Sequence, residues 1–165
     1  MPCGIPPYER FDMSIAARLT ELGITLPTPA KPVANYVPYV ITGNLVVVSG
    51  QIPLKDGKLA FTGKLGDQCS VETGIEAAKL CFINVLAQLQ EACGGDLSRV
   101  KRVVRLGGFI SCNAEFTAHA QVMNGASDLS VAVLGDAGRH ARSTIGVPSL
   151  PMDASVEVEG MFEIA

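Results

Sequence analysis

The chain has 165 residues, a formal net charge of −3 and a sequence pI near 5.3. These values predict one domain and weigh against a general nucleic-acid binder, because phosphate contacts depend on clustered Lys and Arg. The mean hydropathy is +0.32, yet no apolar run approaches the roughly 18 residues that cross a bilayer. The apolar excess therefore indicates a buried core together with a subunit interface.

The cysteines show no ligand or disulfide pattern. The chain has five cysteines, an odd number, and no CxxC or Cys/His spacing. We therefore predict neither disulfides nor a zinc site, and we expect the protein to lie in a reducing cytosol.

Near the N-terminus, prolines and Glu9 stand where a secretory signal needs an apolar stretch, and Met13 is an alternative start. We expect residues 1–31 to form an extension with a short helix, and residues 32–165 to form the domain.

The first expected element is a short amphipathic helix from Ser14 to Gly23. Three prolines between residues 27 and 32 then predict an extended linker. Two β-branched runs flank Gly43-Asn44, which is typical of a hairpin turn, and residues 55–58 have the composition of a second turn.

The strongest helix signal runs from about Ser70 to Cys93, with one apolar face and Gly94-Gly95 as its end. The later segments predict a strand over 99–110, helices over 115–123 and 127–134, and strands over 142–147 and 155–164. This order predicts an α+β domain with helices on one face of a mixed sheet.

The last two strands carry charged residues in alternation with other types. Period two places His140, Arg142 and Thr144 on one face, while Glu157 and Glu159 alternate with valines. An Arg and a Glu on the same side of adjacent strands form a solvated pair worth up to about 1 kcal/mol, or they belong to a site. The pattern alone leaves both interpretations open.

Three blocks in this order resemble the YjgF/Rid family, also called endoribonuclease L-PSP. They are "GNLVVVSGQIP" at 43–53, the long helix ending in Gly-Gly before "DLSRVKRVVRLGGFI", and "ARSTIGVPSLPMDASVEVE" at 141–159. The resemblance implies a chorismate-mutase-like α+β fold and a homotrimer with three clefts between subunits. It also implies hydrolysis of reactive 2-imino acids, such as 2-iminobutyrate and the 2-iminopropionate derived from 2-aminoacrylate, to 2-keto acids and ammonia, without cofactor or metal.

Matched residue by residue, the resemblance makes Arg142 the clamp for the substrate carboxylate and Glu157 the residue that orients the attacking water. A guanidinium forms two parallel charge-assisted hydrogen bonds with a carboxylate. An iminium carbon is already electrophilic, so orientation, a held water and a dry pocket suffice. The other matched positions line the cleft or offer backbone groups to the ligand: Tyr36, Ser49, Gly50, Asn113 and Thr144.

The chain also departs from the family pattern. The stretch between Asn113 and Arg142 is longer by about a dozen residues, His140 replaces the usual Pro, and Gly146 stands where a Glu is frequent. These departures indicate a distinct branch. The position of His140 fits either a site role, in proton transfer or carboxylate contact, or a surface histidine at a loop end.

Two further functions stay open beside imine hydrolysis. One is a trimer that binds small acids, or acts like a chaperone, without turnover. The other is the ribonuclease of the older family name, which needs a basic surface. Arg99, Lys101 and Arg105 form the one basic stripe of the sequence, and the acidic total weighs against this function.

Overall fold

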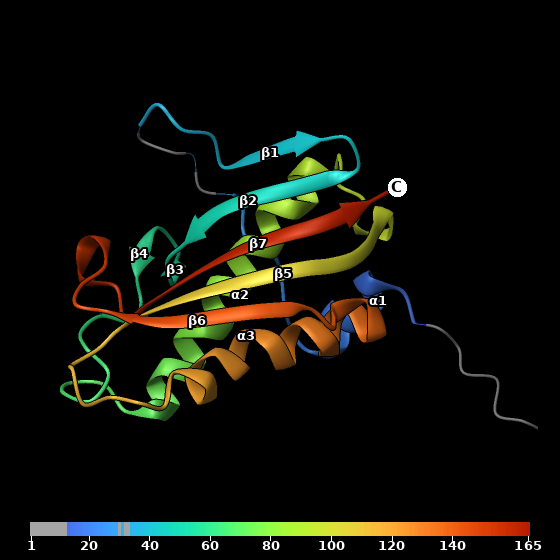
Figure 1. Ribbon diagram of the computed structural model, residues 1–165. Helices are drawn as coiled ribbons and strands as arrows, with labels where there is room; N and C mark the ends of the chain where they lie inside the picture. Colours follow the sequence, from blue (N-terminus) through green and yellow to red (C-terminus); the bar gives the residue numbers. More distant parts are fainter. Residues whose placement is uncertain (1–12, 30, 32–33) are drawn as a thin grey trace, which may run out of the picture.

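The computed structural model describes residues 13–29, 31 and 34–165 (Figure 1). The predictions for residues 1–12 lie outside this part of the chain. Helix α1 (Ile15–Glu21) confirms the short helix: the Oγ of Ser14 accepts a hydrogen bond from the N–H of Ala17 at 3.1 Å, and Gly23 follows the helix with φ +68°. The boundary between residues 31 and 32 stays a prediction.

A five-stranded sheet with the order β1-β2-β7-β5-β6 forms the centre of the domain. Strands β5 and β6 are parallel, and every other neighbouring pair is antiparallel. A separate two-stranded hairpin, β3 and β4, follows β2. The strands are β1 (Tyr39–Thr42), β2 (Leu45–Gln51), β3 (Leu54–Lys55), β4 (Lys58–Leu59), β5 (Val100–Ser111), β6 (Ala141–Val147) and β7 (Val156–Ile164).

Both predicted hairpin turns are confirmed. Gly43 has φ +60° in the two-residue connection between β1 and β2, and Asp56 and Gly57 have φ of +52° and +74° between β3 and β4. These left-handed conformations favour glycine and tolerate aspartate, which explains the turn composition.

Helices α2 (Val71–Ala92) and α3 (His119–Leu134) cover one face of the sheet (Figure 1). The Oγ of Ser70 caps α2 by accepting from the N–H of Thr73 at 3.2 Å, as expected for the start of the long helix. The core between the layers includes the fully buried Phe82, Leu106 and Phe162. Short 3₁₀ segments, Leu97–Arg99, Gly135–Gly138 and Pro151–Asp153, complete the elements. No helix in the described ranges is long and apolar enough to cross a membrane.

The prediction of two helices over 115–123 and 127–134 is wrong, because α3 is continuous. Gly125 does not break it. A Cβ at Gly125 would overlap the backbone carbonyl of Ile75 in α2, so the glycine allows two helices to approach closely. Gly125 is therefore a packing residue.

Arg142 and Glu157 do not lie on the same side of adjacent strands, so this expectation is also wrong. Strand β5 separates β6 from β7. Arg142 stands opposite Leu106, and Glu157 stands opposite Phe109. Positions three apart on a strand point to opposite faces. Arg142 therefore lies on the face covered by the helices, and Glu157 lies on the face that no other layer of the described chain covers.

Candidate functional site

Helix α3 holds the side chain of Arg142 at the edge of the sheet. The Nη1 group donates to Oδ1 of Asn124 at 2.8 Å and to Oγ of Ser127 at 3.0 Å, and Nη2 lies 3.5 Å from the carbonyl oxygen of Ala120. The side chain is half-buried. One edge of the guanidinium is thus fixed by the protein, while the other keeps donors for an anion.

His140 joins the same group of residues. Its Nε2 lies 2.9 Å from Oγ of Ser127, and its Nδ1 lies 2.6 Å from the carbonyl oxygen of Gly138. His140 is half-buried at the end of the loop that precedes β6, and two hydrogen bonds hold its ring close to Arg142.

The face that carries Arg142 continues through Thr144 to Gly146. Within the described chain, Oγ1 of Thr144 is buried and has no hydrogen-bond partner. A Cβ at Gly146 would lie 2.5 Å from Nε2 of His119 and 2.7 Å from Sγ of Cys112. The absent side chain thus leaves room for these two atoms to approach each other at 3.5 Å.

The Cys112 thiol and the His119 ring form a mainly structural pair. Burial raises the pKa of the Cys112 thiol, so the thiol stays protonated and is a poor nucleophile. The His119 ring is half-buried and makes an edge contact with Phe116 at 5.2 Å between ring centres.

Glu157 occupies the opposite face, next to the end of β2. Its carboxyl lies against the α-carbon of Gly50, where any Cβ would overlap Oε1. Burial, with a smaller contribution from the charge of Glu159, raises the pKa of Glu157. Among the described residues, this carboxyl has no hydrogen bond or ion pair, whereas Glu159 pairs with Arg105 at 3.2 Å. Glu157 is thus a partly desolvated carboxyl that remains available to a water or ligand.

Ser49 and Tyr36 belong to the same end of β2. The Ser49 hydroxyl donates to the carbonyl oxygen of Val37 at 2.7 Å, and the Ser49 N–H donates to that of Pro38 at 2.9 Å. These bonds fasten the segment that carries Tyr36, a residue that is 56% exposed. Ser49 therefore holds the neighbouring segment in place, and Tyr36 is free to contact another molecule.

Asn113 lies just beyond β5 and is held by the Leu65–Asp67 loop. Its Nδ2 donates to Oδ1 of Asp67 at 2.9 Å, and its own Oδ1 is buried against Gly66 without a partner in the described chain. No recorded contact joins Asn113 to Arg142 or Glu157.

The predicted site residues therefore fall into separate groups within one chain. His140, Arg142 and Thr144 lie on the helix-covered face, and Ser49 and Gly50 lie beside Glu157 near the other face. The sequence analysis missed Asn124 and Ser127, which anchor Arg142. Their spacing of three residues on a helix could have shown that they share a face, but the predicted break over residues 124–126 left Asn124 outside both helices and Ser127 at the start of the second.

Lys101 of the basic stripe is exposed, whereas the other two cations are engaged within the protein. Arg105 is paired with Glu159 at 3.2 Å, and Nη2 of Arg99 donates to the carbonyl oxygen of Ala165 at 2.8 Å. Acidic and carbonyl oxygens thus occupy these cations, which weakens the case for RNA on this surface.

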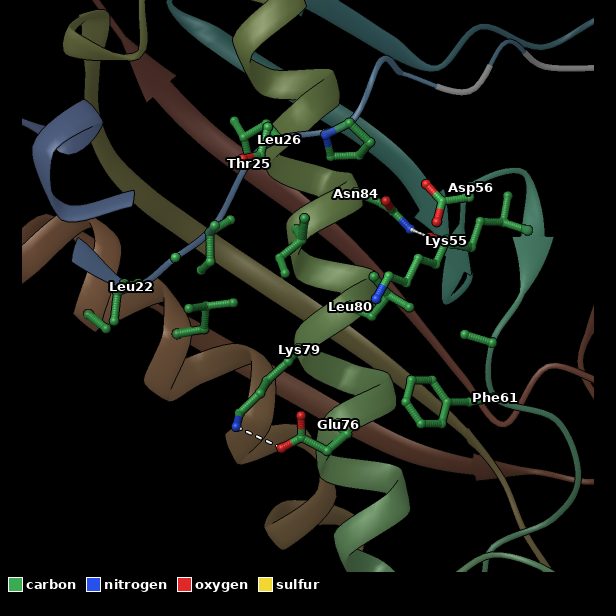
Figure 2. Close-up of a pocket in the computed structure, with 18 of the residues that line it drawn as sticks. Leu22, Thr25, Leu26, Lys55, Asp56, Phe61, Glu76, Lys79, Leu80 and Asn84 are labelled. Atoms are coloured by element: carbon green, nitrogen blue, oxygen red, sulfur yellow. Dashed lines mark hydrogen bonds and ion pairs between the residues drawn. The ribbon is translucent and has the colours of Figure 1, made fainter. Parts of the chain in front are cut away.

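A pocket of about 950 Å³ lies over α2, between residues 22–27 and the β3–β4 hairpin (Figure 2). The Asn84 amide at its edge donates to the carbonyl oxygens of Ile52 and Leu54, and Lys79 pairs with Glu76 at 2.8 Å. These polar groups are already engaged, and no predicted site residue lines the pocket. It is therefore a weaker candidate than the sheet residues.

Comparison with known proteins gives the family. The model of a family described as "YjgF/chorismate mutase-like, putative endoribonuclease" matches residues 16–163. The chain belongs to this family and has its chorismate-mutase-like α+β fold.

Three similar proteins illustrate the range of the family. Protein TCP17 of Trypanosoma cruzi is 47% identical, with 91% of this chain and 94% of that protein covered. A 2-iminobutanoate/2-iminopropanoate deaminase of Dermatophagoides farinae is 31% identical over 86% of this chain and 94% of its own. The crystal structure of Atu1372, a protein of unknown function from Agrobacterium tumefaciens, has a TM-score of 0.87 and 49% identity, with 92% of each chain covered.

Proposed function

We propose that this protein hydrolyses reactive 2-imino acids, including 2-iminobutyrate and 2-iminopropionate, to 2-keto acids and ammonia without a cofactor. The observation that carries the proposal is the arrangement of Arg142, whose guanidinium is anchored along one edge and has donors left for a carboxylate. The relative named as a deaminase of these two imino acids supports the same chemistry. The four described cysteines are unpaired, which fits the reducing cytosol that we propose as its location.

In the proposed reaction, Arg142 binds the substrate carboxylate and Glu157 orients a water. The water oxygen adds to C2 of the protonated imine while Glu157 accepts a proton, giving a carbinolamine. That proton is returned to the nitrogen, and the C2–N bond breaks while the carbinolamine O–H gives its proton to Glu157, so that the C2=O bond of the 2-keto acid forms and ammonia leaves. Glu157 then passes this proton to ammonia or solvent, which restores its carboxylate. The raised pKa of Glu157 makes its carboxylate a stronger base for this step.

One chain does not bring these two groups to the same small substrate. Arg142 and Glu157 lie two strand spacings apart, about 10 Å, and on opposite faces of the sheet. We therefore propose a homotrimer in which Arg142 of one subunit and Glu157 of the next form each site. The uncovered face carries the exposed apolar residues Val40, Val47 and Ile145, which supports burial against another copy.

The direct test follows 2-ketobutyrate release when 2-iminobutyrate is generated in situ. The protein is expected to accelerate release well above the rate in water, and the Arg142→Ala variant is expected to match the rate in water. A purified, folded parent protein that gives no acceleration with either imine would overturn the proposal.

Binding of small acids without turnover is the second candidate. The observation that favours it is that the anchored guanidinium forms an anion site on its own, while Glu157 lies on the other face. Saturable binding of 2-ketobutyrate by a protein that does not accelerate imine hydrolysis would support this alternative.

A further inference from the structure

Ser127 lies between His140 and Arg142 and is hydrogen-bonded to both. Its Oγ is 2.9 Å from Nε2 of His140 and 3.0 Å from Nη1 of Arg142. Ser127 belongs to α3, Arg142 belongs to β6, and His140 precedes that strand directly. The hydroxyl therefore ties the helix to the edge strand at the point where Arg142 leaves the sheet.

The end of this hydrogen-bond chain sets its direction. The carbonyl oxygen of Gly138 can only accept, so Nδ1 of His140, 2.6 Å away, carries a hydrogen. In a neutral imidazole Nε2 is then an acceptor, and the Ser127 hydroxyl donates to it. The Ser127 oxygen accepts from Arg142, which can only donate. The three bonds run in one direction, from guanidinium to hydroxyl to imidazole to carbonyl, and each strengthens the next.

This chain decides which donors of Arg142 remain for a ligand. Both hydrogens of Nη1 are used, one by Ser127 and one by Oδ1 of Asn124. The contact of Nη2 with Ala120, at 3.5 Å, is at the limit of hydrogen-bond range. Among the described residues, Nε has no recorded partner. The Nε–Nη2 edge is therefore the free pair of donors, and such a pair matches the two oxygens of a carboxylate.

We propose that Ser127 and His140 are positioning residues that hold the Arg142 guanidinium with its Nε–Nη2 edge toward the carboxylate of a 2-imino or 2-keto acid. This inference rests on the proposed function of Arg142 as a carboxylate clamp. Ser127 acts through Arg142, and His140 acts through Ser127. Asn124 also holds the guanidinium, because its Oδ1 accepts from Nη1 of Arg142. Asn124 is exposed, and its Nδ2 group can donate to a ligand that binds beside Arg142.

The first test replaces Ser127 with Ala in the full chain. Loss of one hydrogen bond to the charged guanidinium is expected to raise both the Kd for 2-ketobutyrate and the KM for 2-iminobutyrate about tenfold, with kcat changed about twofold or less. The matched control is Ser130→Ala, one turn further along α3. Its hydroxyl donates at 2.8 Å to the same carbonyl oxygen of Gly138 that accepts from His140, but it has no hydrogen bond with Ser127 or Arg142. We expect the control to lower Tm without changing Kd. Equal increases of Kd in both variants would overturn the proposal.

The second test uses two replacements of His140 that differ in reach. The Oε1 of a glutamine can stand where Nε2 stands and accept from Ser127, so His140→Gln is expected to keep Kd within about threefold of the parent. An asparagine can replace Nδ1 but does not reach Ser127, so His140→Asn is expected to weaken binding as much as Ser127→Ala does. The double variant Ser127→Ala with His140→Asn is expected to be no weaker than either single variant. Additive effects would contradict a single chain.

A third measurement does not depend on substrate. Long-range ¹H–¹⁵N spectra of the parent protein, recorded about two pH units above the ordinary pKa of an imidazole, are expected to show His140 protonated on Nδ1, with an Nε2 shift that moves more in Ser127→Ala than in Ser130→Ala. If the parent binds no 2-keto acid and hydrolyses no imine, the proposed function fails, and these spectra still decide whether the chain exists. A His140 protonated on Nε2, or an Nε2 signal that Ser127→Ala leaves unmoved, would overturn the inference.

Discussion

The carboxyl of Glu157 lies so close to the α-carbon of Gly50 that no other amino acid fits at position 50 without moving it. This contact crosses from β7 to the irregular end of β2, where the strand register shifts between Val48 and Gln51. The absent side chain at Gly50 therefore sets where the partly buried carboxyl of Glu157 lies, and it is as much a part of the candidate site as the carboxyl itself.

Gly50→Ala tests this relationship. The added methyl group is expected to displace the Glu157 carboxyl and lower kcat for imine hydrolysis at least tenfold, at a cost of about 1–3 kcal/mol in the free energy of unfolding. Gly107→Ala is the matched control, because its Cβ would meet Oε1 of Glu159, at 2.7 Å, and not Glu157. Kinetics and denaturant unfolding of both variants give the comparison. A Gly50→Ala protein with parental kcat would show that the position of Glu157 does not matter for turnover.

Glu157→Gln tests the role of the charge. The amide keeps the shape of the carboxyl but cannot take a proton from water, so kcat is expected to fall roughly 10²-fold. The Kd for 2-ketobutyrate is expected to change little, because Arg142 is intact. Steady-state rates and isothermal titration measure the two quantities. A parental kcat in this variant would assign the water to another group.

The raised pKa of Glu157 also predicts how this variant responds to pH. The folded protein binds this proton more tightly than the unfolded chain does, so ionisation of Glu157 lowers the free energy of unfolding. Glu157→Gln is expected to be more stable than the parent at about pH 8. The difference is expected to shrink as pH falls through the raised pKa, and to vanish below the ordinary pKa of a glutamic acid. Urea unfolding across this range measures it, and a variant less stable than the parent at neutral pH would contradict the prediction.

Arg142→Lys tests the geometry of the clamp. Lysine keeps the charge but presents a point donor without the planar fork, and it loses the paired contacts to Asn124 and Ser127. We expect 2-ketobutyrate binding to weaken at least tenfold while the circular dichroism spectrum and the assembly state stay as in the parent. Arg142→Ala is expected to remove binding. A lysine variant with parental affinity would mean that charge alone holds the ligand.

The sequence predicted nearly every element, and it failed where a contact between distant segments decides the outcome. Alternation within β6 correctly placed His140 and Arg142 together, since their faces depend on local geometry. The relation of Arg142 to Glu157 depends on which strand lies between β6 and β7, and strand order is not a local property. Gly125 shows the same limit, because its role depends on the carbonyl of Ile75 in another helix. Ser127 was missed because the predicted gap between two helices, residues 124–126, separated it from Asn124, with which it shares a face of α3.

The separation of Arg142 from Glu157 within one chain predicts that each site is shared between two subunits of an assembly. In a ring of three subunits, each contact joins one surface of a chain to a different surface of the next. If Arg142 and Glu157 come from neighbouring subunits, Arg142→Ala and Glu157→Gln homotrimers are both inactive, but mixed trimers contain sites in which both residues are intact. Each mixed trimer contains one intact site in three, so mixed trimers purified over both tags are expected to show about a third of the parental activity per site. To measure this recovery, the two variants are co-expressed with different tags, purified over both tags and tested in the imine assay. Sedimentation of the parent protein is expected to give about three times the chain mass of 17.3 kDa. Co-expressed Arg142→Ala with a second Arg142→Ala copy is the control and is expected to stay inactive. Mixed trimers without activity would place both residues of a site in one chain, and a stable monomer would remove the proposed intersubunit site altogether.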